Sequence, residues 1–167
     1  MPELSLQERL QPSLLDRLID DAPEQQRETP NQRVLTMQRL RECVLRDLTW
    51  LLNSSNLGDR DLAAKYPHVA RSVLNFGLPD LAGVTSSAVD TDELARLVRQ
   101  LIWDFEPRIR RHTLQVRAIT GTDDAAHKSL VFEIEGELWA QPVPLELLVK
   151  TELDLETGDV AVVEFRG

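Results

Sequence analysis

The sequence contains very little cysteine, and it has no long hydrophobic run. Cys43 is the only cysteine among 167 residues, so no internal disulfide can form, and a reducing compartment is favoured. The first residues lack the basic start and apolar core of a secretion signal, and no apolar run approaches the ~18 residues that span a bilayer. We therefore expect a soluble cytoplasmic protein with no direct membrane insertion.

Basic residues are also in short supply. The chain has 19 Lys and Arg against 28 Asp and Glu, which gives a formal net charge of −9. Such a balance argues against a generic binder of nucleic acid or anionic membranes, because that binding depends on cations that neutralise phosphate. Only three of the basic residues are lysines. Arginine, with its planar fork of donors, slightly favours specific bidentate contacts over diffuse charge.

The usual signatures of metal and cofactor binding are missing. His68, His112 and His127 stand apart from one another, and the sequence has no HExxH or CxxC pattern. It has no GxxxxGK or GxGxxG loop for phosphate, and no GxSxG nucleophile elbow. The sequence therefore predicts no metal, no cofactor and no nucleophilic active site.

A pair of carboxylates is the remaining route to catalysis. Asp104 and Glu106 lie close in sequence, but residues two apart on a helix point about 200° from each other. Three arginines follow Glu106, and positive charge favours the ionised carboxylate, whereas a general acid must hold its proton. A glycan hydrolase is thus an alternative hypothesis, as is a generic adaptor module.

The N-terminal segment predicts a short helix on a link. Ser13 has the features of an N-cap, and an apolar stripe follows within residues 10–22, made of Leu14, Leu15, Leu18 and Ile19. The next stretch, 20–33, is polar and contains two prolines, which is typical of a flexible link. We predict a docking helix and link in residues 1–30 and one folded domain in 31–167. Alternatively, the helix packs back on its own core.

Two longer helices are predicted within residues 31–106. Apolar residues recur at helical spacing in 31–53 and, most regularly, in 90–106. Asp90 and Glu93 form a capping-box pattern at the start of the second helix, and Pro107 ends it. Between the two helices we expect a short helix before a loop at 77–83.

The hydrophobic period changes to two in residues 111–167. Alternating stretches occur near 113–118, 130–135, 145–153 and 160–165, and Glu156–Asp159 is typical of a hairpin turn. Helices followed by strands with short turns predict an α+β fold, with N-terminal helices packed on a C-terminal antiparallel β-meander of about four strands. One face of that sheet should pack against the helices.

Charged residues gather where the best helix meets the first strand. They are Glu106, Arg108, Arg110 and Arg111, around Pro107. One hypothesis is an internal ion pair of Arg108 with Glu106, and exposed pairs of that kind contribute only about 0–1 kcal/mol. The other is an arginine-rich contact site for a partner. In that case Arg108→Ala would leave thermal stability nearly unchanged and weaken complex formation by about 2 kcal/mol or more.

Four motifs in order resemble a known family. They are RECVLRDLTWLLN (41–53), SVLNFGLPDLAG (72–83), IWDFEPRI (102–109) and TELDLETGDV (151–160). Together they resemble the TssE family of type VI secretion baseplate wedge components, a branch of the contractile-phage baseplate wedge proteins once labelled lysozyme-like. The Glu-Pro-Arg signature of that family matches Glu106, Pro107 and Arg108, and residues 10–23 resemble the N-terminus of the secretion-system branch.

The resemblance implies a non-enzymatic structural subunit. Its expected partners are the baseplate subunits TssF, TssG and TssK and the TssB–TssC sheath, with the subunit assembled on the membrane-anchored secretion apparatus. The final predicted strand, with Val160 and Val162, comes last in the chain and is expected to be an edge strand. The resemblance adds that sheath strands are plausible partners for that edge.

Overall fold

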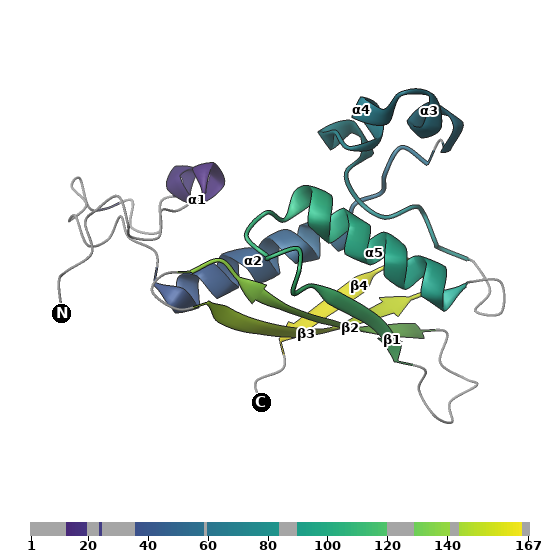
Figure 1. The fold of residues 1–167 in the computed structure, drawn as a ribbon. Coiled ribbons are helices and arrows are strands. Elements are labelled where there is room, and N and C mark those ends of the chain that lie inside the picture. The colour runs from purple at the N-terminus through teal and green to yellow at the C-terminus, as the bar shows by residue number, and fades with distance from the viewer. Residues whose placement is uncertain are drawn as a thin grey trace.

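The computed structural model describes residues 13–19, 24, 36–58, 60–83, 90–119, 129–140 and 144–164. Its centre is a four-stranded sheet in the order β1-β2-β3-β4, in which neighbouring strands are antiparallel (Figure 1). The strands are β1 Gln115–Ile119, β2 Ser129–Leu138, β3 Leu145–Asp154 and β4 Val160–Glu164. The predicted α+β fold with a C-terminal antiparallel meander is confirmed.

Two long helices, α2 (Met37–Leu52) and α5 (Thr91–Phe105), cover the same face of the sheet (Figure 1). The helix predicted in residues 31–53 corresponds to α2. Its predicted start at residue 31 is wrong, because Thr36 is the N-cap of α2 and accepts a hydrogen bond from the amide of Arg39. Residues 31–35 lie outside the described residues. Asp90 caps α5 by accepting from the amides of Asp92 and Glu93, as its position predicts.

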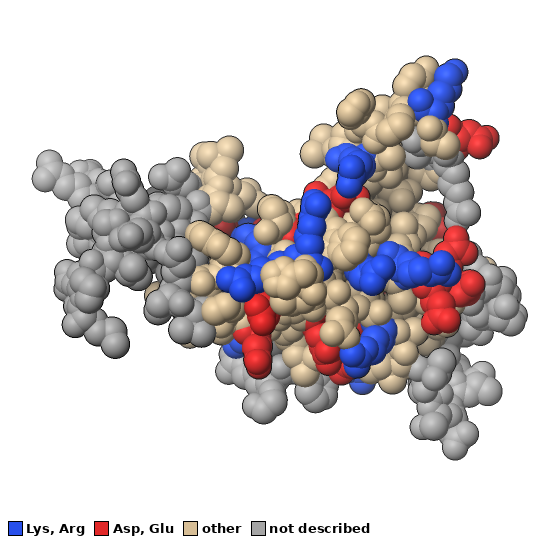
Figure 2. All heavy atoms as spheres, viewed as in Figure 1, with Lys and Arg blue, Asp and Glu red and all other residues tan. Residues whose placement is uncertain are grey.

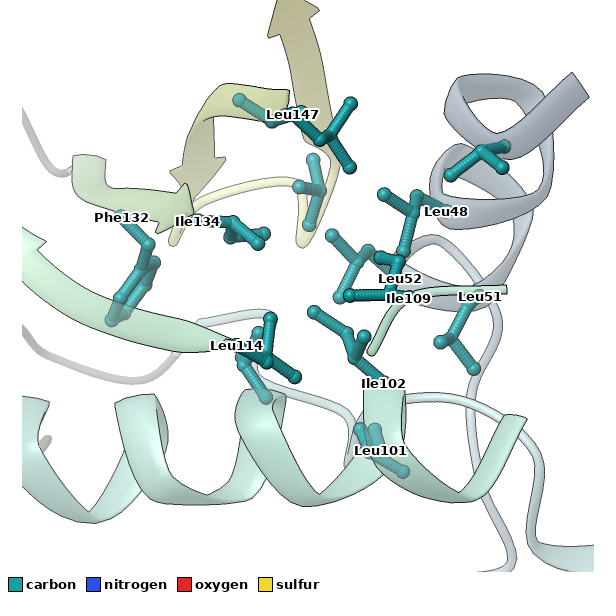
Figure 3. Close-up of a cluster of buried hydrophobic side chains, with 14 of the residues drawn as sticks. Leu48, Leu51, Leu52, Leu101, Ile102, Ile109, Leu114, Phe132, Ile134 and Leu147 are labelled. Carbon is teal, nitrogen blue, oxygen red and sulfur yellow. The ribbon is translucent and has the colours of Figure 1, made fainter. Parts of the chain in front are cut away.

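The core lies between these helices and the sheet (Figure 3). Apolar residues of α2 and α5 meet the inward-facing residues of the strands, and those labelled in the close-up include Leu48, Leu51, Leu52, Leu101, Ile102, Phe132, Ile134 and Leu147. The inward positions alternate along β3, where Leu147, Val149, Thr151 and Leu153 are buried. The apolar residues that recur at helical spacing in the helices and at every second position in the strands are therefore the residues that form the core.

A small helical lobe projects from the far side of α5 (Figure 1). It comprises α3 Arg60–Lys65, α4 Pro67–Ala70 and the 3-10 helix η1 Val73–Asn75. Pro67 fits the first turn of α4, where no intrahelical donor is needed. The rings of Phe76 and Phe105 meet edge to face at 5.2 Å and join the lobe to α5.

The N-terminal helix α1 is short, covering Leu14–Leu18. Ser13 and Asp16 form a reciprocal capping box at its start, and Ile19 is its C-cap. The helix predicted within residues 10–22 is thus shorter than expected, and residues 10–12 and 20–22 lie outside the described part of the chain.

Candidate assembly site at the end of helix α5

Buried Glu106 and half-buried Arg108 form an ion pair at the end of α5. Glu106 is the C-cap of the helix and is only 4% exposed. The guanidinium of Arg108 donates to both carboxylate oxygens, with its Nε 2.7 Å from Oε1 and its Nη2 on Oε2. The backbone amide of Arg108 also donates to Oε1 at 3.1 Å. These hydrogen bonds join the residues on either side of Pro107 and fix the turn from Glu106 to Arg108, which we call the corner.

The pair belongs to a longer chain of charges. The same Nη2 of Arg108 also donates to Asp47 on α2. Asp47 in turn accepts from Arg46 at 2.8 Å, and Arg46 reaches Asp16 on α1 at 2.8 Å. Charges of alternating sign thus connect α1, α2 and the end of α5 in the order Asp16, Arg46, Asp47, Arg108 and Glu106.

The electrostatic environment stabilises the charged forms. Burial lowers the pKa of Arg108, but its contacts with Glu106 and Asp47 outweigh that effect and raise it. Burial alone would raise the pKa of Asp16, but hydrogen bonds from Ser13, Cys43 and Arg46 lower it to about 2. Arg108 and Asp16 are therefore charged at neutral pH, and Asp16 anchors α1 through polar contacts.

Cys43 lies beside this anchor. Burial and the hydrogen bond to Asp16 raise the pKa of its thiol to about 11. A thiol with that pKa is protonated and weakly nucleophilic at neutral pH.

The other predicted contact residues around Pro107 do not join the network of Arg108 and Glu106. Arg110 pairs with Glu137 on β2 at 3.3 Å, and Arg111 donates to the carbonyl of Trp103 at 2.8 Å. Pro107 is exposed. The assumption that Arg108 and Glu106 form an exposed pair is wrong, because the helix end buries Glu106 beneath the corner.

Sequence reasoning missed Asp47 and Arg46 as members of the site. Both belong to the RECVLRDL stretch and flank the apolar stripe of α2, where charged residues usually face solvent. The adjacent opposite charges of Arg46 and Asp47 were the signal in the sequence that could have indicated an ion-pair network. Their partners are distant in sequence, with Arg108 61 residues from Asp47 and Asp16 30 residues from Arg46.

The geometry offers no support for a glycan hydrolase at these carboxylates. Both oxygens of Glu106 accept from Arg108 beneath the surface, while Asp104 accepts from Gln100 and pairs with Arg71. Neither carboxylate is among the residues that line the larger described pocket, which lies near the β3–β4 turn. Among the residues that the structure describes, no group of three or more His, Cys, Asp and Glu is placed to hold a metal ion.

The predicted surface of α1 is exposed to solvent. Leu14 and Leu18 are each 74% exposed, and Leu15 and Ile19 are each 40% exposed. The described contacts of α1 with α2 run through Asp16 instead. The helix therefore has a side anchored by polar contacts and an apolar side on which Leu14 and Leu18 are the most exposed residues.

The last strand is an edge of the sheet, as the sequence predicts. Part of this edge is covered, because the Asn53 side chain accepts from the amide of Val160 at 2.9 Å and donates to its carbonyl at 2.8 Å. Backbone groups of an antiparallel strand alternate between its two sides. The amide and carbonyl of Val162 therefore point to the same open side as those of Val160, and no described residue bonds to them.

Comparison with known proteins identifies a matching family. The family model described as "Baseplate wedge protein gp25" matches residues 38–143, from the first turn of α2 to beyond the end of β2. No curated protein and no solved structure matches the chain. No helix in the described part of the chain is long and apolar enough to cross a membrane.

Proposed function

The chain belongs to the baseplate wedge protein gp25 family, and from this premise we propose that it is a TssE-type wedge subunit of a type VI secretion baseplate. The family is structural and not catalytic, and its general partners are baseplate and sheath proteins. In the proposed assembly the chain joins TssF, TssG and TssK to the first ring of the TssB–TssC sheath. It works in the cytoplasm on the membrane-anchored apparatus.

The observation that carries the sheath contact is the half-covered edge of β4. Asn53 satisfies the outward backbone groups of Val160, whereas those of Val162 have no described partner. An unpaired edge accepts a strand of another chain through main-chain hydrogen bonds. We propose that a sheath strand adds to β4 beyond the Asn53 cover.

Val162→Pro should block this addition without unfolding the protein. Proline removes one amide donor, and that amide points away from β3, so the internal ladder keeps its bonds. We expect sheath elongation from reconstituted baseplates to fall at least about tenfold, while the melting temperature changes by only a few degrees. Val162→Ala, which keeps the amide, is the matched control. Normal elongation by a folded Val162→Pro protein would contradict the proposal.

The exposed side of α1 supports a second contact, with a neighbouring wedge subunit. A helix held to its own domain by an ion pair leaves its apolar side chains free for another surface. Leu14 and Leu18 are the most exposed of these side chains. We propose that they insert into an apolar groove of TssF or TssG.

The double substitution Leu14→Ser and Leu18→Ser tests this contact. Because both side chains are 74% exposed, the melting temperature should stay nearly constant, whereas affinity for the wedge subunits should fall about tenfold or more. Val73→Ser with Leu74→Ser is the matched control, since these side chains on the lobe are 82% and 67% exposed. Equal effects of the two double substitutions on co-purification would count against α1 as the specific contact.

A further inference from the structure

Three arginines from separate segments converge beside Trp103 and Asp104 at the C-terminal end of α5. Arg71, which follows α4, reaches Asp104 at 3.4 Å. The guanidinium of Arg99 lies over the Trp103 ring, 4.9 Å from the ring centroid. Arg111 donates to the Trp103 carbonyl at 2.8 Å. We call Arg71, Arg99 and Arg111 the arginine surface.

The arginine surface is accessible to a partner. All three arginines are exposed, and the side chain of Arg71 is 65% exposed. Within the described residues, Asp104 is the one carboxylate that pairs with any of them, and that single contact is long. Figure 2 shows basic side chains over α5 and below the α3–α4 lobe, with acidic side chains beside them, on a chain whose net charge is −9.

Within the described part of the chain, Arg71 and Arg111 each donate one hydrogen bond from Nη2, and Arg99 stacks on Trp103. Each guanidinium has five N–H donors, and stacking on an indole ring orients the group without using them. The last turn of a helix also favours nearby cations, because the unpaired carbonyls carry partial negative charge. Arginine beside tryptophan is a typical composition of interface hot spots.

We propose that the arginine surface binds a carboxylate-rich segment of a partner protein. The planar fork of each guanidinium matches a carboxylate in two hydrogen bonds. A nucleic acid is the less suitable partner, because its binding depends on cations that neutralise a long row of phosphates, and this surface offers three arginines. The binding adds a surface to the proposed function and does not depend on which subunit supplies the acidic segment.

Binding of a fluorescein-labelled, glutamate-rich peptide to the full chain, followed by anisotropy at low salt, tests the proposal. Arg71→Ala combined with Arg99→Ala should weaken binding about tenfold or more. Arg71→Lys combined with Arg99→Lys should recover only part of that loss, since a point charge does not replace the fork. The matched control is Arg117→Ala with Lys150→Ala, which removes the same charge from exposed positions on the other face of the sheet.

Three results would overturn the proposal. They are no measurable binding of the peptide by the unaltered chain, an equal loss of affinity in the control protein, and tighter binding of a labelled oligothymidylate than of the peptide. The third result would assign the surface to phosphate polyanions instead. These titrations use the isolated chain, so they give an answer even if the chain fails to assemble with TssF, TssG or the sheath.

Discussion

Arg108→Ala is expected to lower the free energy of unfolding by about 3 kcal/mol, the low end of the cost of breaking a buried ion pair. The reason is the position of Glu106, whose side chain is 4% exposed and would lose the bidentate hydrogen bonds that it accepts from Arg108. Asp47 would still have Arg46. For a chain of this size the loss corresponds to a fall of about 6–12 °C in melting temperature, measured by circular dichroism.

Two further variants distinguish this explanation from a general loss of charge. Arg111→Ala removes an exposed arginine with one backbone contact and should change the melting temperature little. Glu106→Ala added to Arg108→Ala should recover part of the lost stability, because no buried polar side chain is then left without its partner. If Arg108→Ala leaves the melting temperature unchanged and abolishes wedge co-purification, Arg108 is a contact residue, as one sequence hypothesis predicts.

The elements of the fold were predictable because their patterns are local. The apolar spacing of α5 and the alternation in β3 each report burial over consecutive residues, so the layer arrangement follows from the sequence. The β3–β4 hairpin was predictable from its turn, where Gly158 has φ of +81°. The lobe was predicted as only one short helix, because α3, α4 and η1 are too short to show a period.

The candidate site was only partly predictable, since it depends on long-range contacts. The residues around Pro107 were identified by their charges, but they pair with residues of α2 and β2, and α1 joins the network only through Arg46. Nothing local indicates that Glu106 is buried, because burial there results from the way α5 meets the corner. Arg71 joins Arg99 and Arg111 only because the lobe folds back over α5.

That return of the lobe depends on a close backbone approach at Gly77. Its φ is +108°, and a Cβ at this position would lie 2.0 Å from the carbonyl oxygen of Ser54. Two backbone hydrogen bonds hold the approach, from Leu78 to Ser54 and from Asn56 to Leu78, each 2.8 Å long. Only glycine fits the space and adopts this conformation without strain.

Gly77→Ala is therefore expected to lower the free energy of unfolding by about 4 kcal/mol, combining backbone strain with the loss of those hydrogen bonds. The melting temperature should fall by about 8–16 °C. Gly58→Ala is the matched control, because Gly58 also has positive φ, +68°, but a Cβ there meets nothing within 4 Å. It should cost only the local strain of about 1–2 kcal/mol. Equal losses in the two variants would show that positive φ alone, and not the contact with Ser54, sets the requirement for glycine.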